Sequence, residues 1–297
     1  MKKAIFIQPR HFNAPETGLG HVYLPTSVFM AASRVLAAGG DVRCYDENLR
    51  QVPSSDLATA EVIGTHTTGT SLLPCTLDLT KRIENEFPNI QLVHGGQQIS
   101  SLDVDPRHNP VRFKRLFGEA ASNGNFDEKL AASLDIRQED LPDVESTSII
   151  PVLEKLSDSD LRTYLSAKSM SLYVAQGCNK ACSFCTAVRT RKTPEQTPLK
   201  NLVASTPDSF SGRVKEVYRD IDVTKKDLSY LVGKASELGV SALTIYMSNL
   251  DICQTPEKLY EFAQAAIDVK KSYPDVKMKL TALATIAEFK LMDAKHQ

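Results

Sequence analysis

Short apolar runs that alternate with amphipathic stretches predict the fold of the first third of the chain. Four runs rich in apolar and β-branched residues predict strands at about residues 4–8, 41–45, 61–64 and 91–94. Apolar positions at helical spacing between them predict helices over about residues 25–38 and 72–87, and Gly39 and Gly40 end the first of these. This alternation favours a parallel, doubly wound sheet, in which ligands bind at the carboxyl ends of the strands.

The same alternation returns in the last third of the chain. Residues 171–177 predict a strand, and a helix follows that is expected to open at a capping box formed by Thr224 and Asp227. A strand at 242–247, a helix from Pro256 with Ile267 on its core face, and a strand at 277–283 come next. This order predicts part of a parallel (βα) barrel with its active site at the carboxyl ends of the strands. The charged stretch before it, with a helix start at Ser157, is expected to connect the two regions.

Composition and charge narrow the classes of function. A chain of 297 residues suggests roughly two domains, and its net charge of −1 gives no overall basic field that would indicate nucleic acid. No run approaches the about 18 apolar residues of a membrane span, and the amino terminus lacks the hydrophobic region of a signal peptide. We therefore expect a soluble, cytoplasmic protein.

Three cysteines carry the clearest chemical signal. Cys178, Cys182 and Cys185 have C-x-x-x-C-x-x-C spacing and directly follow the strand predicted at 171–177. Soft thiolates on one short loop suit an iron–sulfur cluster or zinc. Structural zinc prefers four protein ligands, yet no second C-x-x-C lies nearby and no histidine occurs between Cys178 and His296. A disulfide between Cys182 and Cys185 would leave Cys178 unexplained. Zinc and incidental cysteines remain the alternatives.

The cysteine spacing, with an aromatic residue before the third cysteine, resembles the signature of the radical S-adenosylmethionine superfamily. Here the aromatic residue is Phe184. The resemblance implies that Cys178, Cys182 and Cys185 hold a [4Fe–4S] cluster whose fourth iron chelates S-adenosyl-L-methionine. It also implies reductive cleavage to methionine and a 5′-deoxyadenosyl radical, with electrons from a flavodoxin or a ferredoxin. In this family the end of the second barrel strand contacts the amino group of S-adenosylmethionine, which here implies Ser248 and Asn249.

The order of elements in residues 1–130 resembles the cobalamin-binding domain that precedes the barrel in many of these enzymes. The resemblance makes cobalamin a candidate cofactor, bound over Thr65, Gly95 and Gly96, and makes methyl transfer to an unactivated carbon the candidate reaction. The D-x-H-x-x-G context of a cobalt-ligating histidine is missing. His66 and His94 are therefore expected to be ordinary strand-end histidines.

Three segments follow from these observations. A cobalamin-binding-like domain is expected at 1–130, a connecting helical segment at 131–168, and the first half of a radical S-adenosylmethionine barrel at 169–297. Each βα unit needs roughly 30 residues, so the sequence after Cys185 is too short to close a six-unit barrel. We expect a fragment, half of a split enzyme, or a barrel completed by a second chain.

Two other functions are left open by the sequence. One is a radical enzyme without bound cobalamin, and the other is a non-catalytic metal-binding or interaction protein. Nothing in either half of the sequence identifies the substrate, which could be a small molecule or a peptide.

Overall fold

The structure is a computed structural model that describes residues 2–11, 23–67, 72–96, 99, 117, 126–167, 169–178, 214–248 and 255–282. These residues form two compact units. The first unit takes its described residues from 1–21 and 34–142 together with Val214, and the second takes its residues from 22–33, 143–179 and 215–297. The helix α1 (Thr26–Ala37) therefore contributes residues to both units. The division into three segments expected from the sequence stays a prediction.

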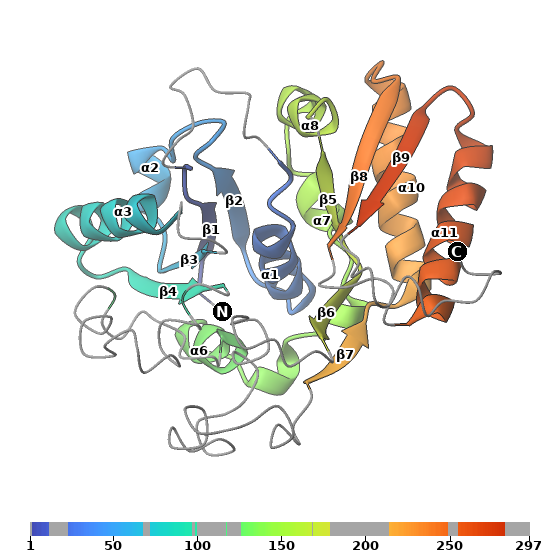
Figure 1. The fold of residues 1–297 in the computed structure, drawn as a ribbon. Coiled ribbons are helices and arrows are strands. Elements are labelled where there is room, and N and C mark those ends of the chain that lie inside the picture. The colour runs from blue at the N-terminus through green and yellow to red at the C-terminus, as the bar shows by residue number, and fades with distance from the viewer. Residues whose placement is uncertain are drawn as a thin grey trace. The chain divides into compact units, whose positions relative to one another are not determined.

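The first unit is built on a four-stranded parallel sheet, as the sequence predicted. The strands β1 (Ala4–Gln8), β2 (Val42–Asp46), β3 (Val62–His66) and β4 (Gln91–Gly95) lie in the order β2-β1-β3-β4 (Figure 1). Every residue of β1 is buried, as expected for a central strand covered on both faces. The structure also shows the predicted helix α3 (Leu73–Glu86) and a short helix α2 (Ser54–Leu57) that the sequence did not indicate.

One apolar cluster holds the first sheet to its helices. It joins β1, β3 and β4 with α2 and α3, and its buried members are Ile5, Ile7, Val52, Leu57, Ala60, Ile63, Leu79, Ile83 and Leu92. Gly64 lets the Phe6 ring pack against β3, because a Cβ at Gly64 would lie 2.7 Å from that ring. At the end of α1, Gly39 has a φ of +86°, which explains why the helix stops there.

Short helical elements fill the stretch that the sequence predicted as a connecting segment. They are α6 (Phe126–Ser133), the 3₁₀ turns η4 (Gln138–Asp140) and η5 (Val144–Ser146), α7 (Ile150–Leu153) and α8 (Asp158–Leu165). Ser157 caps α8 as predicted, and its side chain accepts a hydrogen bond from the Asp160 backbone N–H at 3.1 Å.

The second unit contains a second parallel sheet. Its strands β5 (Met170–Tyr173), β8 (Ala242–Ser248) and β9 (Lys277–Ala282) lie in the order β5-β8-β9. The strands β6 (Ala175–Cys178) and β7 (Val214–Tyr218) form a separate pair. The one strand predicted at 171–177 is thus divided at Val174 into β5 and β6, and β7 was not predicted. The α/β class and the parallel sheets are confirmed, whereas the partial radical S-adenosylmethionine barrel stays a proposal.

Two long helices, α10 (Ile221–Glu237) and α11 (Pro256–Ser272), lie beside the second sheet (Figure 1). The predicted capping box of α10 is wrong. Asp220 caps the helix instead, accepting from the backbone N–H groups of Asp222 at 2.8 Å and Val223 at 3.1 Å. Thr224 lies inside the helix and donates to the Asp220 carbonyl oxygen, and Asp227 is fully buried. The sequence pattern fitted a cap, but an earlier residue satisfies the first N–H groups.

The buried face of α11 is also shifted from the predicted one. Phe262 and Ala266 are buried as expected, but Ile267 is 50% exposed. The buried positions Ala265 and Val269 take its place. The helix is therefore rotated by about one position relative to the predicted apolar face.

Candidate functional site

The strand that leads to the cysteines is interrupted at Val174, where backbone hydrogen bonds hold it in place. Val174 is fully buried between β5 and β6, and its backbone N–H donates to the Ser248 carbonyl oxygen at 3.4 Å. Its carbonyl oxygen accepts from the backbone N–H of Arg219 at 2.9 Å. After this point β6 runs to Cys178, its last residue. Cys182 and Cys185 lie outside the described residues.

Ser248 lies at the carboxyl end of β8, beside the end of β5, the strand after which β6 runs to the first cysteine. Ser248 is the last residue of β8 and is paired in register with Tyr173, the last residue of β5. Since both strands are parallel, their carboxyl ends meet at one edge, which is where ligands bind in sheets of this type. Asn249, the other predicted contact to S-adenosylmethionine, lies outside the described residues.

A buried ion pair anchors this edge. Arg219 and Asp227 have fully buried side chains, and one guanidinium N–H₂ group of Arg219 contacts the Asp227 carboxylate. The same group donates to the Thr147 carbonyl oxygen at 2.6 Å, and the other lies 3.5 Å from the Tyr173 carbonyl oxygen. Arg219 thereby joins the end of β7 to the end of β5.

Asp227 is held by further donors from the preceding segment. Its carboxylate accepts from the Ser148 hydroxyl and from the Ile149 backbone N–H, the latter at 3.2 Å. Loss of either member of this buried pair would leave an uncompensated charge in the interior. Neither residue was predicted from the sequence. The signal that could have found them is an aspartate at a core position of α10, which requires a buried partner.

The remaining predicted cofactor residues, Thr65, Gly95 and Gly96, belong to the first sheet. Thr65 is 2% exposed, and its hydroxyl lies 2.6 Å from Nδ1 of His94. On the other side of the ring, Nε2 lies 3.1 Å from the Thr80 hydroxyl, which donates to the Thr76 carbonyl oxygen at 2.7 Å. Thr80 must therefore accept from the Nε2–H group, and Nδ1 accepts from Thr65.

This network makes His94 a neutral structural residue. Burial, with a smaller contribution from the positive charge of Lys129, lowers the pKa of His94 to about 3. The ring of Phe117 packs against it with centroids 4.9 Å apart. His66, at the end of β3, also has its pKa lowered by burial, to about 4. Both histidines thus have the character expected of ordinary strand-end residues.

The space beside the two glycines is filled by the protein itself. A Cβ on Gly95 would lie 2.5 Å from the Phe126 ring. Gly96 has a φ of +104°, and a Cβ there would overlap the backbone of Thr67. Both glycines permit close approach, as predicted, but the group that approaches is a neighbouring part of the first unit.

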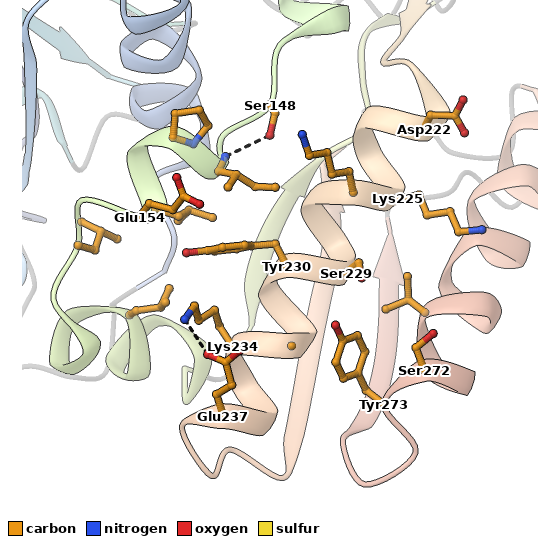
Figure 2. A pocket seen from close by; sticks show the side chains of 18 of the residues that line it. Ser148, Glu154, Asp222, Lys225, Ser229, Tyr230, Lys234, Glu237, Ser272 and Tyr273 are labelled. Atoms are coloured by element: carbon orange, nitrogen blue, oxygen red, sulfur yellow. Dashed lines mark hydrogen bonds and ion pairs between the residues drawn. The ribbon is translucent and has the colours of Figure 1, made fainter.

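A polar groove of about 1140 Å³ lies elsewhere in the second unit, between α7, α8, α10 and α11 (Figure 2). Gly233 makes room in it for the Tyr273 hydroxyl, which would lie 2.9 Å from a Cβ at that position. Lys234 pairs with Glu237 at 2.6 Å, and Lys225 pairs with Asp268 at 2.8 Å. The groove contains no residue of β5, β6 or β8, so it does not belong to the cysteine-bearing edge.

Within the described residues, no group of three or more histidine, cysteine, aspartate or glutamate side chains is arranged to hold a metal ion. Two of the three motif cysteines lie outside that part of the chain. Cys44 and Cys75 form no disulfide and are only partly buried, and burial raises the pKa of Cys75. We therefore interpret these two cysteines as not belonging to the predicted metal site.

The chain matches no protein-family model, no curated protein and no solved structure. Among the helices that the structure describes, none is both long enough and apolar enough to cross a membrane. The features of this chain that bear on its function are the cysteine motif and the geometry of the second sheet.

Proposed function

We propose that the protein is a radical S-adenosylmethionine enzyme. One observation carries the proposal: the C-x-x-x-C-x-x-C motif starts at the last residue of β6, which continues a strand of a parallel sheet. The next two strands of this sheet, β8 and β9, follow in chain order with α10 and α11 near them in sequence. A thiolate loop at the carboxyl end of a strand in such a sheet is where a substrate-binding cluster would be placed.

The residues of the chain have separable roles in this proposal. Cys178, Cys182 and Cys185 would hold a [4Fe–4S] cluster, which when bound supplies the electron that cleaves S-adenosylmethionine to methionine and a 5′-deoxyadenosyl radical. Ser248 and Asn249 would contact the amino group of S-adenosylmethionine. The hydrogen bonds of Val174 to Ser248 and Arg219 hold the cysteine-bearing strand at a fixed position beside β8. The proposal implies a cytoplasmic protein that receives electrons from a flavodoxin or a ferredoxin.

The structure favours the form of this proposal without cobalamin. Thr65 is committed to His94, and the sides of Gly95 and Gly96 are occupied by Phe126 and Thr67. These three predicted residues therefore already have protein contacts on the sides described, and no step is assigned to cobalamin. Absorption spectra after incubation with hydroxocobalamin test this, since a bound corrin would restore methyl transfer as the candidate reaction.

Anaerobic reconstitution with iron and sulfide tests the proposed cluster. We expect a brown species with about four irons and four sulfides per chain, lost in Cys182→Ala and retained in the control Cys75→Ser. Incubation with S-adenosylmethionine and dithionite should then yield 5′-deoxyadenosine. A chain that takes up zinc without iron and sulfide would instead be a non-catalytic metal-binding protein, and an unchanged species in Cys182→Ala would refute the cluster assignment.

A further inference from the structure

The second sheet has two chemically different faces. Along β8, buried Leu243, Ile245 and Met247 alternate with partly or fully exposed residues. Parallel pairing places the corresponding residues of β5 and β9 on the same faces. The side opposite the apolar face is called here the hydroxyl face, and its described residues are Ser171, Tyr173, Ala242, Thr244, Tyr246, Ser248, Lys277, Lys279 and Thr281.

Such a face is unusual for a parallel sheet. Parallel sheets normally bury both sides, and their strands then read as continuous apolar runs. The first sheet of this protein follows that rule, because all five residues of β1 are buried. In β8 only every second residue is buried, and the residues between them carry hydroxyl groups. The hydroxyl face is therefore polar and only partly buried, unlike either face of β1.

The register arranges the hydroxyl face in rows. Nearest the cysteine-bearing edge, Tyr173 lies beside Ser248. In the next row Tyr246 stands between Ser171 and Thr281, and neighbouring strands are about 4.8 Å apart. This three-strand row of hydroxyls is long enough to contact a sugar-sized molecule. The following row pairs Thr244 with Lys279.

The charge of this face is of one sign. Its described residues include Lys277 and Lys279 and no carboxylate. None of the ion pairs formed among the residues that the structure describes uses either lysine. In the groove of Figure 2, by contrast, Lys225 and Lys234 are paired with acids. A lysine ammonium that pairs with no acid among the described residues, in the row next to the three hydroxyls, is suited to a phosphate group.

We propose that the hydroxyl face binds a small phosphorylated polyhydroxyl compound, such as a sugar phosphate. Lys279 contacts the phosphate, and the hydroxyls of Tyr246, Thr281 and Ser171 contact the hydroxyl groups. The compound is thereby oriented with its phosphate toward the amino ends of the strands and its carbon skeleton toward Cys178. As an assignment of substrate class, the inference rests on the proposed radical function.

Binding can be measured without any cluster. Isothermal titration calorimetry of the full chain with ribose 5-phosphate, ribose and inorganic phosphate uses defined probes. We expect ribose 5-phosphate to bind more tightly than either part alone. A charge-assisted hydrogen bond contributes about 1.5–3 kcal/mol, so Lys279→Met should weaken its binding at least about tenfold, and Lys279→Arg should retain most of it. Tyr246→Phe and Thr281→Val should each weaken it by about two- to tenfold.

Lys226→Met is the matched control, because Lys226 is an exposed lysine of the groove and not of the hydroxyl face. It should leave the affinity unchanged. The inference is overturned by absent binding of ribose 5-phosphate, by equal affinity for ribose, or by an equal loss in Lys226→Met. Because the cluster is not needed, any of these results leaves the proposed function standing. If the cluster fails to assemble but the sugar phosphate still binds, the proposed radical function is contradicted and the binding site on the hydroxyl face stands.

Discussion

At the scale of single residues, the buried pair of Arg219 and Asp227 has the largest predicted effect on stability. Both side chains are fully buried, and Asp227 has two further donors. Replacing Asp227 by Asn leaves the Arg219 charge without a counter-ion in the interior. We expect a loss of about 3–5 kcal/mol in the free energy of unfolding, measured by urea denaturation.

The control for this substitution is the partly exposed pair of Lys234 and Glu237, which solvent screens. Glu237→Gln should change the free energy of unfolding much less than Asp227→Asn. Equal effects of the two substitutions would show that burial of the Arg219 pair is not what stabilises the second unit. Arg219→Met with Asp227→Leu should recover part of the loss, because no lone charge remains.

His94 gives the protein a predicted dependence on pH. Its folded pKa is about 3, below the ordinary value of 6.5, because burial disfavours the charged ring. Between these values the unfolded chain binds more protons, so the contribution of His94 is complete above pH 6.5 and is lost as the pH falls toward 3. His94→Gln should be less stable at pH 7, since the amide replaces the contacts of the ring imperfectly, but its stability should fall less steeply between pH 7 and pH 4.

Urea midpoints at several pH values measure this difference. His66→Gln is the comparison, because the pKa of His66 is also lowered by burial, to about 4, although the residue is less deeply buried. Its stability profile should flatten by a smaller amount. Parallel profiles for the wild type and His94→Gln would contradict a neutral, buried His94.

At the scale of elements, the sequence predicted those strands and helix ends that depend only on residues close together in the chain. The apolar runs of β1 to β4 and the glycine end of α1 were predicted, because burial and backbone conformation act within a few residues. It missed β7 and the break at Val174, since both depend on pairing with distant segments through Arg219 and Ser248. The same limit applies to the site: cysteine spacing is local, whereas the partner of Asp227 is set by the tertiary fold.

The start of α10 shows how a local pattern can mislead. Thr224 and Asp227 fit a capping box, yet the Asp220 carboxylate accepts from the first backbone N–H groups. Asp220→Ala should therefore reduce the free energy of unfolding by about 1 kcal/mol, measured by urea denaturation. Thr224→Ser keeps the hydroxyl and should cost less. A larger effect of Thr224→Ser than of Asp220→Ala would restore the capping box as the true helix start.

At the scale of the whole molecule, the described residues proposed to take part in the reaction belong to the second unit and not to the first. In the first sheet the predicted ligand positions are filled by protein groups, such as Phe126 beside Gly95. In the second, Val174, just before the cysteine-bearing strand β6, is hydrogen-bonded to the end of β8, and one face of the sheet carries hydroxyls and lysines. The proposed reaction and the proposed substrate therefore both fall on the second unit, and the first unit is assigned no catalytic step.

The division into two units also predicts which elements unfold first when a buried residue is substituted. Contacts cluster within each unit, so loss of the Arg219 pair should loosen β5, β8 and α10 before it affects the first sheet. Hydrogen–deuterium exchange of Asp227→Asn in mild urea should show faster exchange in peptides of these three elements, with β1 and β3 unchanged. The helix α1 contributes residues to both units, so its first half should follow the second unit and its end the first. Uniform acceleration throughout the chain would mean that the two units unfold as one.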